Sequence, residues 1–184
     1  MSIHQRRPQR RYKGFIMQDS LAAALSSTCP VAVLVEYQLV HDNRWIDGRW
    51  VVTGVVASKQ PVEEGLQRKL IHSGDEAQQY LWTGLRIELH KDDAESFYCN
   101  LMSDNPSVFV ICDEQQDAPL QPSIVTLSYS EATTYMETDQ RVERVEMPAE
   151  LYRWLEQYVL ANYVPEKKKK RKRVDWKESD RGRH

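Results

Sequence analysis

The chain has 184 residues, a formal net charge of −2, 41% hydrophobic residues and three cysteines. This length allows one domain with a hydrophobic core and flanking tails. The cysteines, Cys29, Cys99 and Cys112, are far apart and give neither a disulfide framework nor a C-x-x-C metal pair. Free thiols, the lack of a signal sequence and the lack of an apolar run that could span a bilayer predict a cytoplasmic protein.

The small net charge conceals a separation of charge along the chain. Residues 1–14 carry five cations and no acid, and residues 166–184 carry ten cations and four acids. Residues 15–165 carry the remaining ten cations and 23 acids. We therefore predict a basic disordered arm at 1–14, a single acidic domain at 15–165 and a basic disordered tail at 166–184.

The first predicted strand covers residues 31–39, where apolar side chains alternate along the chain. Further on, Asp47-Gly48 favours a two-residue type I′ turn and hence a tight hairpin. This turn would place Leu39 opposite Val56, so that apolar residues meet across the strands.

The same turn places Trp45 directly opposite Trp50, with Arg44 and Arg49 beside them. Such a pair can be core packing, or it can be an exposed anchor of the Trp and Arg type that protein interfaces favour. Trp82 alternates onto the polar face of its predicted strand, so we count it with these candidate partner-binding residues.

The rest of the chain alternates between strand and helix patterns. Strands are predicted at 66–72, 81–89, 108–112, 124–127 and 142–147, and helices at 92–102, after a capping box at Ser128 and Glu131, and at 148–163. The inward positions of the helices include Met102 in the first and Met136 in the second, and in the last Leu151, Trp154, Leu155, Tyr158, Val159 and Tyr163. Tight early connections predict an α+β fold, a mainly antiparallel sheet with two or three helices packed on one face.

No catalytic constellation is evident in the sequence. The five histidines show no ligand spacing, the glycines are scattered, and no Ser/His/Asp arrangement occurs. The acids Asp92, Asp93 and Glu95 are explained by the first turn of a helix, where carboxylates complement the dipole. We therefore expect no catalytic residue, no metal and no cofactor.

The basic tail contains seven consecutive cations: Lys167, Lys168, Lys169, Lys170, Arg171, Lys172 and Arg173. Such a run can be a solvated tail, or it can bind nucleic acid, anionic lipid or an acidic protein. The acidic domain would repel the phosphates of a nucleic acid, and no lipidation motif supports membrane attachment. A protein partner is the favoured interpretation.

Several stretches together resemble a proteobacterial family of unknown function that is commonly encoded beside formate dehydrogenase genes. The likeness covers about residues 30–176. Its motifs are Arg44-Trp45, Trp50, Gly54-Val55-Val56, Trp82-Thr83-Gly84-Leu85, Glu88-Leu89-His90, Glu95, Tyr98, Asn100-Leu101, Pro106-Ser107-Val108-Phe109-Val110, Ser128-Tyr129-Ser130-Glu131-Ala132, Leu151-Tyr152-Arg153-Trp154-Leu155, and Tyr163-Val164-Pro165-Glu166 with the cations that follow.

The resemblance implies a non-catalytic accessory protein for a molybdenum- or tungsten-dependent formate dehydrogenase, acting in maturation, assembly or subunit coupling. Its partner would be the dehydrogenase or one of its maturation proteins. The main alternative is a regulator that binds nucleic acid through its basic ends, and a third is a small enzyme with an unrecognised site.

Overall fold

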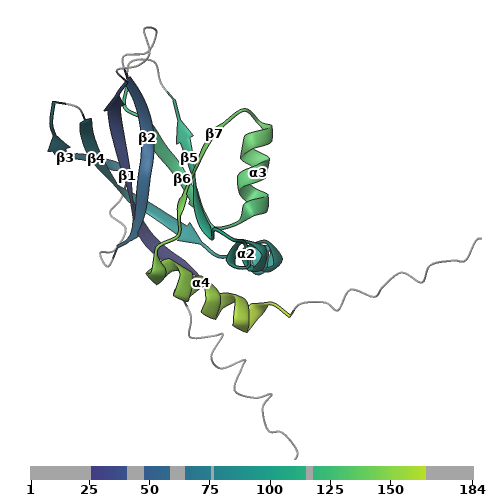
Figure 1. The fold of residues 1–184 in the computed structure, drawn as a ribbon. Coiled ribbons are helices and arrows are strands. Elements are labelled where there is room, and N and C mark those ends of the chain that lie inside the picture. Colours follow the sequence, from purple (N-terminus) through teal and green to yellow (C-terminus); the bar gives the residue numbers. More distant parts are fainter. Residues whose placement is uncertain (1–25, 41–47, 59–64, 76, 115–117, 165–184) are drawn as a thin grey trace, which may run out of the picture.

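The computed structural model describes residues 26–40, 48–58, 65–75, 77–114 and 118–164 (Figure 1). Two antiparallel sheets occur within these residues. The four-stranded sheet has the order β2-β1-β4-β3 and consists of β1 (Thr28–Leu39), β2 (Gly48–Ala57), β3 (Gln67–Ser73) and β4 (Ala77–Glu88). The three-stranded sheet has the order β6-β5-β7 and consists of β5 (Ser107–Asp113), β6 (Gln121–Thr126) and β7 (Arg141–Glu146).

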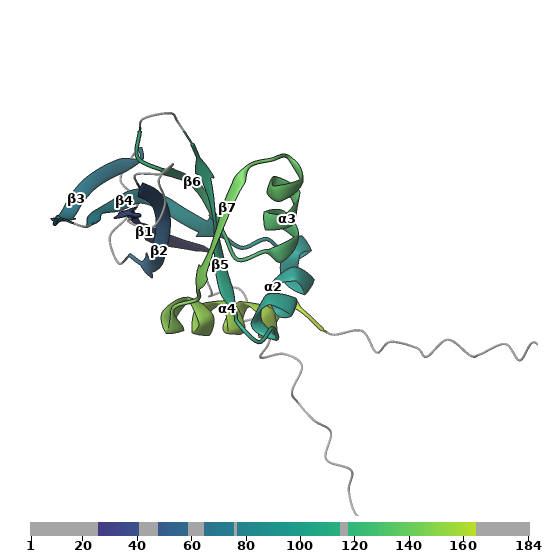
Figure 2. The ribbon, with the colours of Figure 1, turned by 45° about the horizontal axis from the view of Figure 1, so that its top comes forward.

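A short 3₁₀ turn, η1 (Lys91–Asp93), leads into α2 (Ala94–Leu101), and the other helices are α3 (Tyr129–Glu137) and α4 (Ala149–Asn162). Both ribbon views place β3 on the side of the molecule away from α2 and α3 (Figures 1 and 2). The α+β class with mainly antiparallel strands is confirmed, and the strands divide between two sheets. None of the described helices is long and apolar enough to cross a membrane.

Helix α4 has the predicted apolar stripe. Leu151, Leu155, Tyr158 and Val159 are buried in the common core. The Tyr158 ring meets Phe97 of α2 edge to face, with ring centroids 6.2 Å apart, and its hydroxyl donates to the Leu89 carbonyl at 3.2 Å. The helix therefore fastens α2 and the end of β4 to the core.

The short helices do not bury all of the apolar residues predicted to face inward. Ser128 caps α3 as expected, since its Oγ accepts from the Glu131 N–H at 3.2 Å. Met136 and Met102, which we predicted to face inward, are 47% and 67% exposed. Each lies at the C-terminal end of a short helix, beyond the last residue of that helix that is buried in the core.

The buried side chain of Asn100 joins α2 to two strands. Its Nδ2 donates to the carbonyls of Ser107 and Leu127, both at 2.8 Å, and its Oδ1 accepts from the Ser107 N–H at 3.0 Å. A single amide thus satisfies three backbone groups that would otherwise be buried without partners.

The predicted hairpin register between β1 and β2 is wrong. Leu39 lies opposite Gly48 rather than Val56, and Trp50 lies opposite Tyr37. Gly48 begins β2, and a side-chain atom added there would collide with the Tyr37 ring. The glycine therefore serves the close approach of an aromatic ring, not a two-residue turn.

The prediction that Trp82 faces solvent is also wrong, because β4 contains a bulge. Two steps along β1, from Val31 to Val33, match three steps along β4, from Leu85 to Trp82. Gly84 in this bulge has a φ of +88°. The extra residue reverses the alternation of inward and outward side chains, so Trp82 enters the core and is 6% exposed.

Candidate protein-binding surface

The structure describes only some of the predicted site residues. Arg44 and Trp45, and the tail cations from Lys167 to Arg173, lie outside the described residues. Trp82 is buried in the core. Arg49 and Trp50 are therefore the predicted residues whose surroundings can be used to define a surface.

Trp50 belongs to a cluster of aromatic side chains on one face of the four-stranded sheet. Directly paired residues project on the same face of a sheet, and the register pairs Trp50 with Tyr37 across β2 and β1. The ring centroid of Trp50 lies 4.9 Å from that of Tyr37 and 5.7 Å from that of Tyr80 on β4. These three partly buried rings form the centre of the surface.

The edge strand β3 completes this surface. Arg68 lies opposite Trp82, and Leu70, which is 49% exposed, lies opposite Tyr80. We define the aromatic surface as Tyr37, Trp50, Arg68, Leu70 and Tyr80.

A cation lies against the aromatic rings, but it is not the predicted one. The Arg68 guanidinium carbon is 5.3 Å from the Tyr80 ring centroid and 5.8 Å from that of Trp82, which is cation–π geometry. Arg49 is paired with Gln38, one position along from Trp50, and so lies on the opposite face. The sequence offered no signal for Arg68, because its position depends on which strand pairs with β3.

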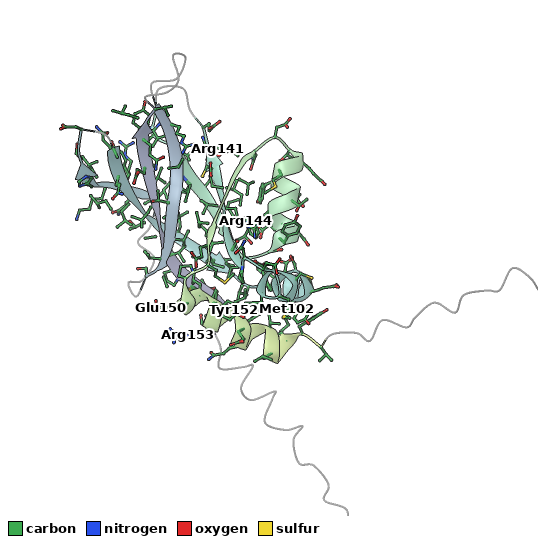
Figure 3. All side chains as sticks on the ribbon, viewed as in Figure 1. Met102, Arg141, Arg144, Glu150, Tyr152 and Arg153 are labelled. Carbon is green, nitrogen blue, oxygen red and sulfur yellow. The ribbon has the colours of Figure 1, made fainter. Side chains whose placement is uncertain are left out.

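Arg141 ties the aromatic surface to the three-stranded sheet. From the start of β7 (Figure 3), its Nη2 donates to the Trp50 carbonyl at 2.6 Å. Its guanidinium also pairs with Glu114 and Glu143. The partly buried arginine therefore links β7 to β2 at the Trp50 carbonyl.

The opposite face of the sheet combines apolar residues, such as Leu34 and Leu81, with a polar group around Glu36. The Glu36 carboxylate accepts hydrogen bonds from Gln79 and Gln38, and these bonds, that from Gln79 foremost, lower the pKa of Glu36 below its usual value. An ionised carboxylate held by amides suits a solvated face. The face that carries the aromatic rings also carries the buried Val35 and Val52 and packs on the core, so the candidate contact region is its partly exposed end at Tyr37, Trp50 and Tyr80.

A hollow of about 250 Å³ adjoins the aromatic surface. Tyr37, Leu39 and Trp50 form one side, and Gly74, Asp75, Ala77 and Gln78, from the turn between β3 and β4 and the start of β4, form the other. Leu39 is 40% exposed at its rim. The aromatic surface therefore includes a recess that can receive part of a bound molecule.

A second cavity, of about 450 Å³, contains the side chains most suggestive of catalysis, among them Glu88, His90, Asp93 and Glu131. Glu88 pairs with Arg86 at 2.6 Å, and Glu131 accepts from the Thr126 hydroxyl at 2.6 Å. These contacts hold the local strands and the start of α3. Within the described residues no group of three or more His, Cys, Asp or Glu side chains is arranged to hold a metal ion.

A third hollow, of about 570 Å³, lies where β7 leads into α4 and includes Asp104, Glu146, Tyr152 and Arg153. Figure 3 labels Tyr152 and Arg153 on α4. Arg153 donates to the Ala149 carbonyl of its own helix at 3.2 Å. This hollow combines charges of both signs and lacks an aromatic cluster of the kind found around Trp50.

The comparisons with known proteins define a family and no activity. No curated protein and no solved structure matches the chain significantly. The model of a family described as a protein of unknown function, DUF3305, matches residues 30–172, which is well over half of the chain. The chain therefore belongs to the DUF3305 family, whose function is unknown.

Proposed function

We propose that this protein is a non-catalytic accessory protein that binds a protein partner through the aromatic surface. The observation that carries the proposal is the cluster of Tyr37, Trp50 and Tyr80 with Arg68 on its edge. Trp, Tyr and Arg dominate the binding energy of protein interfaces because they combine large apolar area with directional polar groups. Exposed Leu39 and Leu70 extend the apolar area.

The protein is proposed to act in the cytoplasm, and its proposed partner is a molybdenum- or tungsten-dependent formate dehydrogenase or one of its maturation proteins. The sequence resemblance to a family encoded beside formate dehydrogenase genes supports this choice. The polar groups of the 450 Å³ cavity already have partners within the fold, which favours a binding role over catalysis. The basic tail would add an electrostatic contact to the same partner.

Replacing Trp50 tests this proposal. In cells that lack the native gene, we expect the Trp50→Ala variant to restore no more than about one tenth of the formate dehydrogenase activity that the wild-type chain restores, as for a central interface residue. The matched control is Trp154→Ala, which removes another partly buried tryptophan, on α4. The thermal midpoint of each purified variant separates lost binding from lost folding.

The result that contradicts the proposal is full dehydrogenase activity with a Trp50→Ala protein that remains folded. Recovery of nucleic acid instead of dehydrogenase subunits, with an affinity that falls steeply as salt is added, would favour the alternative of a nucleic-acid-binding regulator.

A further inference from the structure

We propose that the hollow beside Trp50 binds an organic cation, presented as a lysine or arginine side chain by the protein partner. The inference rests on the proposed function and adds the chemistry of the group that enters the aromatic surface. Three features support it: two aromatic rings that line the hollow, an exposed carboxylate at its rim, and the acidic character of residues 15–165.

The rings provide the first feature. Tyr37 and Trp50 both line the 250 Å³ hollow, and their ring planes are inclined at 51° to each other. Aromatic faces attract cations through the ring quadrupole, and tryptophan does so most strongly. The two rings lie in contact, with centroids 4.9 Å apart, and both border the space that a head group would enter.

The carboxylate of Asp75 provides the second feature. Asp75 is exposed in the turn between β3 and β4, lines the same hollow, and forms no ion pair within the described part of the chain. Gln78, also in the lining, accepts a hydrogen bond from the Tyr80 hydroxyl at 3.0 Å. A cation in the hollow would therefore have both aromatic rings and a carboxylate among the groups that line it.

The net negative charge of the whole domain also favours a cation in the hollow. Residues 15–165 contain ten cations and 23 acids. A domain with this balance attracts positively charged groups and repels negatively charged ones. An acidic peptide or a nucleic-acid phosphate is therefore disfavoured as the occupant.

Arg68 of the aromatic surface and Arg141 beside it are each engaged by other groups of the fold. Arg68 lies over the Tyr80 ring at 5.3 Å and the Trp82 ring at 5.8 Å. Tyr80 is two residues along β4 from Gln78, roughly 7 Å at ~3.3 Å per residue. Arg141 is held by Glu114, Glu143 and the Trp50 carbonyl. Neither arginine is among the residues that line the hollow.

The size of the hollow favours a side chain over a larger free ligand. Its volume of about 250 Å³ is below the ~300 to 1,000 Å³ typical of small-molecule sites. Ammonium and guanidinium head groups on a flexible stem fit such a recess. The affinity of the head group alone would be weak, and the rest of the aromatic surface would supply the remaining contacts.

The test uses choline and its neutral isostere, 3,3-dimethylbutan-1-ol, with the full chain labelled with ¹⁵N. The reporter is the Trp50 indole N–H resonance, assigned with the Trp50→Phe variant. We expect choline to shift this resonance in the millimolar range, with an affinity about five- to thirtyfold higher than that of the alcohol. Equal shifts with both probes, or none with choline, would overturn the cation site.

A matched pair of variants tests the carboxylate. Asp75→Asn should weaken choline binding at least about threefold, while Asp113→Asn, which removes an exposed carboxylate at the end of β5, should leave it unchanged. Equal effects from the two variants would show that Asp75 acts only through the overall charge of the domain, and this result would overturn its assigned role. Micromolar choline affinity would overturn the partner side chain as the ligand and indicate a free quaternary amine.

The outcomes for this inference and for the proposed function are separable. If Trp50→Ala abolishes support of the dehydrogenase but choline does not bind, the accessory function stands and the cation site is rejected. If choline binds but Trp50→Ala supports full dehydrogenase activity, the accessory function is rejected, and with it the assignment of the cation to that partner.

Discussion

Asn100 shows how one residue can hold three elements together. Because its amide bonds backbone groups of Ser107 and Leu127, we expect Asn100→Ala to lower the free energy of unfolding by about 3 kcal/mol, since buried donors and acceptors lose their partners. Urea denaturation measures this loss. Asn162→Ala is the control, because Asn162 makes a single bond to Tyr158 at the end of α4, and it should cost less than about 1 kcal/mol. Similar losses from both variants would contradict the role of Asn100.

Several residues of the sequence resemblance have structural roles of this kind. Asn100 and Ser107 join α2 to β5, and Ser128 caps α3. Trp154 donates its indole N–H to the Ser26 carbonyl at 2.9 Å. These motifs therefore identify the fold more than they identify a site, which is why they did not point to Arg68 or to the hollow beside Trp50.

Among the elements, β4 depends on a glycine at its bulge. Gly84 has a φ of +88°, and a side-chain atom there would collide with the Gly65 carbonyl oxygen. We expect Gly84→Ala to destabilise the protein by at least about 2 kcal/mol, from left-handed strain and this collision. Thermal or urea unfolding gives the value.

Gly54→Ala is the matched control for Gly84. An added atom at Gly54 would make an ordinary 3.8 Å contact with Leu34, so we expect this variant to change stability by less than about 1 kcal/mol. If Gly84→Ala were as stable as Gly54→Ala, the bulge would not require glycine, and the explanation for the buried position of Trp82 would fail.

The sequence predicted the strands and helices better than it predicted their registers. Apolar periodicity located β1, β4 and α4, and an unbroken apolar run located β5, because side-chain burial alone sets these patterns. It could not locate bulges, since one extra residue in β4 reverses every later side chain without changing the composition. Both errors at the candidate site, the expected Trp45 and Trp50 pair and the exposed Trp82, arise from register.

At the scale of the molecule, the two sheets and the helices share one hydrophobic core. Buried residues of that core come from β1, β5 and α4, as in Val33, Val110 and Leu155. We therefore expect a single cooperative unfolding transition, with far-ultraviolet circular dichroism and tryptophan fluorescence giving the same midpoint. Two separate midpoints would show that the sheets unfold independently and would contradict a shared core.

The exposed edge of β3 affects how the protein behaves when it is concentrated. All seven residues of β3 are exposed, and β3 pairs only with β4 among the described strands. A strand of this kind is a template for aggregation, yet it carries Arg68 and Lys69, no acid, and a bulge at Ile71. Positive charges and a bulge oppose pairing between copies of the same edge. The strand can therefore support the aromatic surface while it resists assembly into amyloid-like fibres.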